Sequence, residues 1–276
     1  MIVSASRRTD IPALYLPWLS RRLQEGFCLV RNPHNPHSVS RVDLRPQAVD
    51  GMVLWTKNPI PLLQLPPALA RIPFYIQCTV TAYGRDLEPG LPPKPEILAA
   101  FRELAARLGP ARLVWRYDPI LFSAAYSLET HVARFADLAA QLEGCTDACV
   151  VSFLDSYRCT ARAERALGLY RPAPDLAQAL LRRLVPIARA HGMSVQACAE
   201  ESDLSALGVE RAHCVDPARF ARLTGEALRV PRDRSQRPAC GCAASVDIGA
   251  YDSCLHGCAY CYANHGRAVD RLAALH

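Results

Sequence analysis

Three cysteines near the C-terminus are the residues of this chain best suited to carry out chemistry. They stand in Cys254-Leu-His-Gly-Cys258-Ala-Tyr-Cys261, a C-x3-C-x2-C spacing with an aromatic residue just before the last thiol. Three closely spaced thiolates can hold three irons of a cubic [4Fe–4S] cluster and leave the fourth iron without a protein ligand. An iron that is open to a small molecule is a place where a reaction can occur.

Two other readings of the same three cysteines stay open. With a fourth cysteine or histidine, the triplet could form a closed, structural zinc site. Electron-transfer proteins of the ferredoxin type also use close cysteine runs, although they usually place four thiolates on each cluster at C-x2-C spacings. The open-iron hypothesis is the one that the spacing favours.

A second group of four cysteines lies just upstream of this loop. Four thiolates predict a closed and fully ligated site, either a second [4Fe–4S] cluster that exchanges electrons with the first or a structural zinc. We favour iron–sulfur, and His213 is a reserve ligand. Segment 198–262 would then carry both metal sites. The four cysteines of the second group are Cys198, Cys214, Cys240 and Cys242.

Short β-rich runs alternate with longer segments whose apolar residues recur at helical spacing, which predicts an α/β fold with a parallel sheet. Seven strands are enough for a partial or full TIM-like (β/α) barrel, and we expect residues 1–276 to form a single domain. The predicted strands are residues 2–5, 52–55, 74–81, 112–116, 149–153, 194–197 and 245–248. The predicted helices are residues 14–25, 95–108, 130–142, 175–191 and 217–228, and the proline-rich stretches 32–36, 59–67 and 88–95 are predicted loops.

Polar side chains follow nearly every predicted strand. In (β/α) barrels the carboxyl ends of the strands converge on the active site, so these side chains and the cysteine loop are expected around one cavity. Asp10 and Asp118 could instead serve only as helix caps or turn residues. In strand order, the candidates are Arg8 and Asp10, Lys57, Thr79 and Thr81, Arg116 and Asp118, Ser152, and Glu200.

Composition narrows the class of protein further. No stretch approaches the roughly 18 apolar residues of a membrane helix, and no signal-peptide pattern opens the chain, so we expect a cytoplasmic protein without a membrane partner. Its 12 cysteines would then stay reduced, which favours metal ligation over disulfides. The net charge of +6 comes almost entirely from scattered arginines, which gives only weak support for nucleic-acid binding.

The chain as a whole resembles the bacterial DUF1848 proteins. The resemblance rests on residues 2–12 (IVSASRRTDIP), 29–33 (LVRNP), 55–59 (WTKNP), 83–86 (YGRD), 115–120 (WRYDPI), 198–200 (CAE), 240–242 (CGC) and the cysteine loop. That family has no known function, but its C-terminal cysteine cluster is similar to the one that radical S-adenosylmethionine enzymes carry near their N-termini. The resemblance implies a radical-enzyme fold and cofactor and says nothing of the substrate.

The position of the cysteine loop differs from the usual radical-enzyme order, in which it follows the first strand. Here it follows the last, and a circular permutation would explain this, since nearby termini permit such rearrangement. If residues 245–276, which end in about one further helix, preceded Met1, the order would be similar to the spore photoproduct lyase branch. In that branch a later strand ends in Thr-Lys, here Thr56-Lys57.

The resemblance implies roles for the candidate residues. S-adenosylmethionine would bind the open iron at Cys254, Cys258 and Cys261, and an electron donor such as flavodoxin or ferredoxin would drive its cleavage to a 5′-deoxyadenosyl radical. Tyr260 would contact the adenine. By strand-end position, the cofactor's carboxylate and ribose would meet Thr79, Thr81, Arg116, Ser152 and Glu200, and the substrate would meet Arg8, Asp10, Lys57 and Asp118.

Three functions therefore remain open. The first is a radical enzyme acting on a small molecule, peptide or nucleic acid. The second is a metal-stabilised nucleic-acid-binding module with zinc in both sites, and the third is an electron carrier that ignores S-adenosylmethionine. Polar residues at the strand ends favour the first, because an electron carrier needs no such cavity. His256 and His265 flank the cysteine loop and could tune a cluster through hydrogen bonds to sulfur or simply be solvated.

Overall fold

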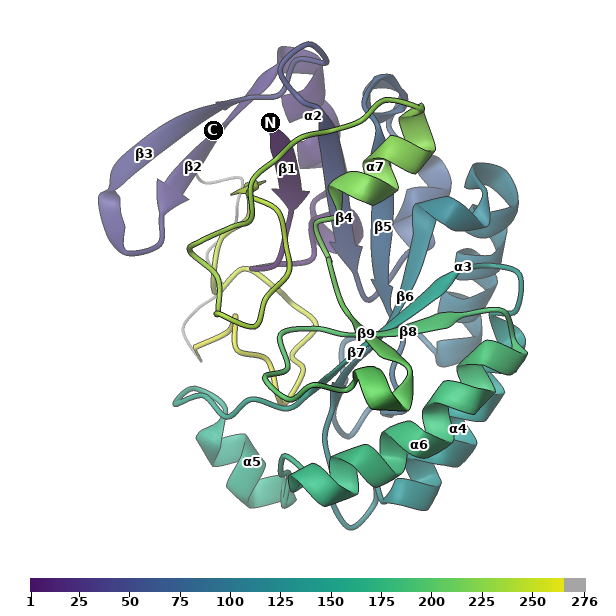
Figure 1. The fold of residues 1–276 in the computed structure, drawn as a ribbon. Coiled ribbons are helices and arrows are strands. Elements are labelled where there is room, and N and C mark those ends of the chain that lie inside the picture. The colour runs from purple at the N-terminus through teal and green to yellow at the C-terminus, as the bar shows by residue number, and fades with distance from the viewer. Residues whose placement is uncertain (266–276) are drawn as a thin grey trace.

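A single parallel sheet of eight strands organises the computed structural model, which describes residues 1–265 (Figure 1). The strands lie in the order β10-β1-β4-β5-β6-β7-β8-β9, and every neighbouring pair is parallel. Their bounds are β1 Ile2–Ala5, β4 Gly51–Thr56, β5 Phe74–Thr79, β6 Leu113–Ile120, β7 Ala148–Phe153, β8 Ser194–Ala197, β9 Val209–Arg211 and β10 Val246–Asp247. A separate antiparallel hairpin consists of β2 Phe27–Asn32 and β3 Asn35–Asp43.

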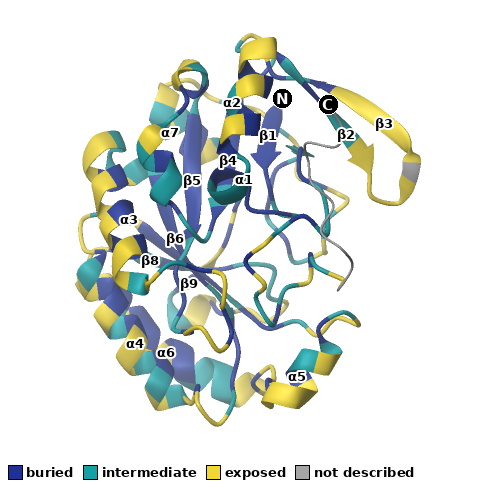
Figure 2. Cartoon of the chain, turned by 180° about the vertical axis from the view of Figure 1, so that it is seen from behind, coloured by how far each residue is buried: buried dark blue, intermediate teal, exposed yellow. Residues whose placement is uncertain are grey.

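Helices follow most of the strands and cover the outer face of the curved sheet (Figures 1 and 2). They are α1 Ile11–Leu14, α2 Leu16–Glu25, α3 Lys94–Leu108, α4 Leu128–Gln141, α5 Ala161–Leu167, α6 Pro174–Ala190 and α7 Pro217–Thr224. Short 3₁₀ helices span Ile60–Gln64, Pro67–Arg71, Pro110–Arg112 and Ser205–Leu207. No helix in residues 1–265 has both the length and the apolar character needed to cross a membrane.

Alternating residues of the strands feed two different cores, as the period of a strand requires. Met52 and Leu54 of β4 face the large core against the outer helices, whereas Val53 belongs to a second core with Ile2 and Tyr75. Segment 212–243, including α7, covers that second face. The sheet is therefore buried on both faces, and loops lie at the carboxyl ends of its strands.

The seven predicted strands all occur, at bounds within a few residues of those expected. Strand β9, which has only three residues, was not predicted, and residues 32–36, predicted as a proline-rich loop, belong to the β2–β3 hairpin. Residues 59–67 were also expected to be a loop, but part of this stretch forms 3₁₀ helix. Proline at the first helical position suits a short helical turn as well as a loop.

The structure confirms the predicted α/β fold with a parallel sheet flanked by helices. It does not show a closed barrel. Within the described residues no strand pairing joins β9 to β10, so the ring is not closed by hydrogen bonds. Strand order follows chain order except for β10, which lies outside β1. This placement is the one that the predicted permutation of 245–276 requires, although residues 266–276, with the expected last helix, lie outside the described part.

Candidate active site

The cysteine loop begins at the carboxyl end of β10 and is tied to the end of β1. Asp247 accepts hydrogen bonds from Ser6 Oγ at 2.5 Å and from the Arg7 amide at 2.8 Å. Gly249 allows this close approach, because a Cβ there would lie 2.0 Å from Ser6 Oγ. The loop is thereby brought to the edge of the sheet where the polar strand ends lie.

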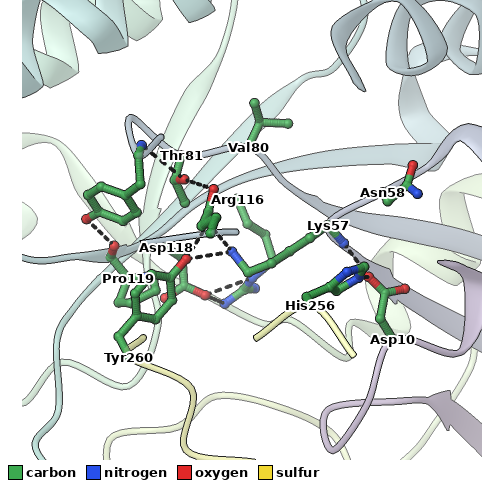
Figure 3. A network of polar contacts seen from close by, with 12 residues as sticks. Asp10, Lys57, Asn58, Val80, Thr81, Arg116, Asp118, Pro119, His256 and Tyr260 are labelled. Atoms are coloured by element: carbon green, nitrogen blue, oxygen red, sulfur yellow. Dashed lines mark hydrogen bonds and ion pairs between the residues drawn. The ribbon is translucent and has the colours of Figure 1, made fainter. Parts of the chain in front are cut away.

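Asp10 fixes the middle of the cysteine loop (Figure 3). One of its oxygens accepts from His256 Nε2 at 2.9 Å and from the Lys57 amide at 2.7 Å. The other accepts from the Ala13 amide at 3.0 Å and caps α1. Asp10 and His256 are both buried, so this carboxylate joins three separate segments at once.

The segment after β5 holds the other side of the loop. The Ala259 amide donates to Leu87 O at 2.9 Å, and the Gly90 amide donates to His256 O at 2.9 Å. A Cβ on Gly90 would lie 2.6 Å from His256 O, so only glycine permits this backbone contact. The cysteine loop is thus clamped between the segments that follow β1 and β5.

Glu88 is the centre of a buried ionic cluster beside the thiols. Its carboxylate accepts from Lys57 Nζ at 2.9 Å and from Lys94 Nζ at 3.1 Å, and also from Thr81 Oγ1 at 2.9 Å and from the Tyr260 hydroxyl. Lys57 Nζ also donates to the Tyr260 oxygen at 2.9 Å. We call these five residues the Glu88 cluster.

Charge balance explains how the Glu88 cluster tolerates burial. Burial alone would raise the pKa of Glu88, but the ammonium groups of Lys57 and Lys94 outweigh it and lower the pKa to about 2. One carboxylate between two ammonium groups leaves an excess positive charge. Lys57 carries this charge toward Cys258, where it opposes the effect of burial on the thiol pKa.

The three thiols of the loop are half-buried and lie within electrostatic range of one another. Burial raises the pKa of Cys254 and of Cys258 to about 12 and raises that of Cys261. Such thiols lose their protons only when a nearby cation compensates, and a bound metal is the usual one. Among residues 1–265, no three His, Cys, Asp or Glu side chains are already placed to hold a metal ion.

A cavity of about 590 Å³ opens between the segment after β5 and helices α3 and α4. Thr81, Glu88 and Lys94 line its wall, together with Arg85 and Arg134. The Glu88 cluster therefore has a small-molecule-sized space on one side and the cysteine loop on the other.

The second thiol group lies near Arg116, on the inner face of the sheet. Arg116 donates to Cys214 Sγ at 3.0 Å, to Gln77 Oε1 at 3.2 Å and to Asp118 Oδ2 at 2.6 Å. The Cys214 and Cys198 sulfur atoms are 3.5 Å apart. Burial would lower the pKa of Arg116, but nearby Cys214 and Asp118 more than offset this and raise it well above its ordinary value.

The model of a domain of unknown function, DUF1848, matches residues 2–263, nearly the whole chain. The chain belongs to the DUF1848 family. No curated protein matches it. The family match confirms the resemblance drawn from the motifs, and it does not extend to the spore photoproduct lyase branch, which stays an expectation.

In this DUF1848 chain the structure brings only some of the predicted site residues to the cysteine loop. Asp10, Lys57, Thr81 and Tyr260 gather there, through the contacts of Asp10 and of the Glu88 cluster. Asp10, expected to face a substrate, is fully engaged in holding segments together. Arg8 lies with its guanidinium carbon 5.5 Å from the centre of the Tyr251 ring.

The other predicted residues gather along the strand ends of β6, β7 and β8. Ser152 donates to Asp118, which Arg116 also contacts. Glu200 accepts from the Phe153 amide at 2.9 Å and pairs with Arg171. Thr79 ends the neighbouring strand β5, in register with Arg116. Of this second set Arg116 contacts Cys214 Sγ, and none of the five residues belongs to the Glu88 cluster.

Sequence reasoning missed Glu88, Lys94 and the anchoring role of His256. Glu88 stands before Pro89-Gly90 in a segment that was expected to be an ordinary loop, and Lys94 opens a helix. One signal was available: Lys57 and Lys94 are the only two lysines in an arginine-rich chain. His256 is buried, and its ring contacts Asp10, which excludes the solvated alternative.

Proposed function

We propose that this DUF1848 protein is a radical S-adenosylmethionine-type iron–sulfur enzyme that acts on a small molecule, peptide or nucleic acid. The observation that carries the proposal is the C-x3-C-x2-C loop of Cys254, Cys258 and Cys261, anchored at the carboxyl edge of a parallel sheet beside a buried ionic cluster. Thiolates are the ligands that iron–sulfur clusters require, and three of them leave one iron open. Burial of the thiols and the cation of Lys57 beside Cys258 suit that donor set.

When bound, a reduced [4Fe–4S] cluster and S-adenosylmethionine would supply the chemistry, namely one-electron cleavage to methionine and a 5′-deoxyadenosyl radical that would abstract hydrogen from the substrate. A flavodoxin or ferredoxin would be the electron donor. The protein's part is to orient the reactants and exclude water.

The chain's own residues divide that work in the proposal. Lys57 places a positive charge beside Cys258, and Glu88 holds Lys57 in position. Tyr260 offers an aromatic face next to the last thiol, and its hydroxyl is fixed by the same cluster. Thr81 is bound to Glu88, so contact with the cofactor's carboxylate or ribose would require it to exchange this partner.

The proposal is tested by anaerobic reconstitution with iron and sulfide, followed by reduction and addition of S-adenosylmethionine. We expect 5′-deoxyadenosine from the wild-type protein and none above background from Cys258→Ala. Cys145→Ala is the matched control, because Cys145 is a half-buried thiol outside both groups, and it should retain the activity.

Two other outcomes would favour a different function. Clusters that form and reduce while S-adenosylmethionine stays intact would favour electron transfer. Zinc in the Cys254 loop, with no iron that can be inserted, would contradict the proposal and favour a metal-stabilised binding module.

A further inference from the structure

The four upstream thiols come from three segments that the fold holds together on the inner face of the sheet. Cys198 follows β8 and Cys214 follows β9, while Cys240 and Cys242 belong to segment 226–245, which precedes β10. Cys214, Cys240 and Cys242 are buried and Cys198 is half-buried. All four belong to the core on that face or pack against it.

Backbone hydrogen bonds fix each of these segments. The Cys198 amide donates to Val151 O at 2.8 Å, and the Ala243 amide donates to Val215 O at 3.0 Å. Tyr75 Oη donates to Cys214 O at 2.7 Å. The convergence of the four thiols is therefore built into the fold and does not depend on side-chain rotamers alone.

The spacing of two sulfur atoms bears on the metal that the group could take. Cys198 and Cys214 have their Sγ atoms 3.5 Å apart, and Cys214, Cys240 and Cys242 lie in the same buried core. A tetrahedral ion with Zn–S bonds of about 2.3 Å places its sulfur ligands about 3.8 Å apart. In a [4Fe–4S] cluster each cysteine binds a different iron, so the sulfurs stand further apart.

Two arginines lie close to the thiols. The guanidinium of Arg116 donates to Cys214 Sγ at 3.0 Å. Arg237 is a second cation whose field reaches Cys198. Four thiolates around one divalent cation carry a net charge of −2, which these arginines help to offset.

We infer that Cys198, Cys214, Cys240 and Cys242 bind one zinc ion in a closed tetrahedral site that ties segment 226–245 to the β8–β9 edge of the sheet. Binding releases the protons of the thiols and forms four Zn–S bonds. In the thiol form Cys214 donates to Cys198 Sγ, so the side chains must rotate to surround the ion. His213 is exposed and donates through Nδ1 to Gly241 O at 2.6 Å, and the proposed four-thiolate set does not include it.

This inference differs from the iron–sulfur cluster that the sequence favours for the second group. Sequence spacing cannot separate the two metals, and the 3.5 Å approach of the Cys198 and Cys214 sulfur atoms favours a single ion. It is also independent of the proposed radical chemistry, since it concerns different cysteines.

The experiment uses the full chain with Cys254, Cys258 and Cys261 all changed to serine, so that the first loop binds no metal. After incubation with zinc chloride and gel filtration, elemental analysis should find about one zinc per chain. Adding Cys240→Ser or Cys242→Ser should abolish it, whereas adding Cys145→Ser should not. The absence of zinc from the parent variant, or iron in its place after reconstitution with iron and sulfide in competition with zinc, would overturn the inference.

A further variant distinguishes the loss of a zinc ligand from misfolding. Cys242→His keeps four ligands, so cobalt(II) should still bind in tetrahedral geometry, with weaker sulfur-to-metal charge-transfer absorption than the parent. An unchanged cobalt spectrum would exclude Cys242 as a ligand and overturn the four-thiolate assignment. The cleavage assay for S-adenosylmethionine reports on the other cysteines, so the two proposals can fail separately.

Discussion

Glu88 shows why single residues of this site had to be found from the structure. Spacing identified the cysteines, because metal ligands near one another in sequence leave a pattern. Glu88, Lys57 and Lys94 come from three segments with no shared motif, and their meeting depends on where β4 and β5 end and where α3 begins. Asp10 was found by its place after β1, but its role in anchoring His256 required the contact itself.

Replacing Glu88 by glutamine should lower the free energy of unfolding by about 2 kcal/mol. The loss leaves two ammonium groups without their carboxylate, and their partial exposure keeps the cost below that of a fully buried pair. Urea denaturation of the metal-free protein measures it. Glu226→Gln, at an exposed position, should change stability little, and an equal loss in both variants would contradict the role of the cluster.

The pH dependence of that difference follows from the lowered pKa. Folding lowers the pKa of Glu88 from 4.5 to about 2, so its ionised form stabilises the folded state fully above pH 4.5. The stability difference between wild type and Glu88→Gln should be constant near neutral pH and shrink as the pH falls from 4.5 toward 2. A difference that does not change over this interval would mean that Glu88 is not held as a carboxylate.

At the scale of elements, the cysteine loop is positioned by its neighbours rather than by regular structure of its own. Alternating β and α patterns located the seven predicted strands, because buried parallel strands carry continuous apolar runs. They missed β9, which is too short to show a pattern, and the hairpin, whose strands are largely exposed. The packing of the loop against Gly90 and Asp10 is a long-range contact that no local pattern encodes.

Asp10→Ala should loosen the cysteine loop. It removes the cap of α1 and the acceptor for His256 and the Lys57 amide, so we expect a loss of about 2 kcal/mol and faster amide hydrogen exchange in residues 252–262. Asp216→Ala is the matched control, since Asp216 caps α7 through the Ala218 amide. If both variants exchange the loop amides equally fast, Asp10 does not anchor the loop.

At the scale of the whole molecule, the parallel sheet and its carboxyl edge form a unit from which the β2–β3 hairpin projects (Figures 1 and 2). Its two strands pair only with each other. The fold class followed from the sequence because strand and helix alternate along it. Whether the sheet closes into a ring could not be predicted from the sequence, because closure depends on how the two edge strands meet.

Replacing residues 31–39 by an Asn-Gly turn should therefore leave the rest of the fold intact. Val30 and Ser40 face each other across the hairpin, so a two-residue turn can join them. We expect the melting temperature to fall by no more than about 4 °C, as measured by circular dichroism. A much larger fall would show that the hairpin supports the sheet.

The pairing of β10 with β1 has a consequence for how the protein is made. Ribosomes deliver the chain from its N-terminus at roughly 5–20 residues per second, so β1 emerges long before its outer partner, Val246–Asp247. The sheet from β1 to β9 can assemble before β10 is available to pair with the free edge of β1. If Cys254, Cys258 and Cys261 bind a cluster as proposed, its delivery would then be a late step, after most of the sheet has formed.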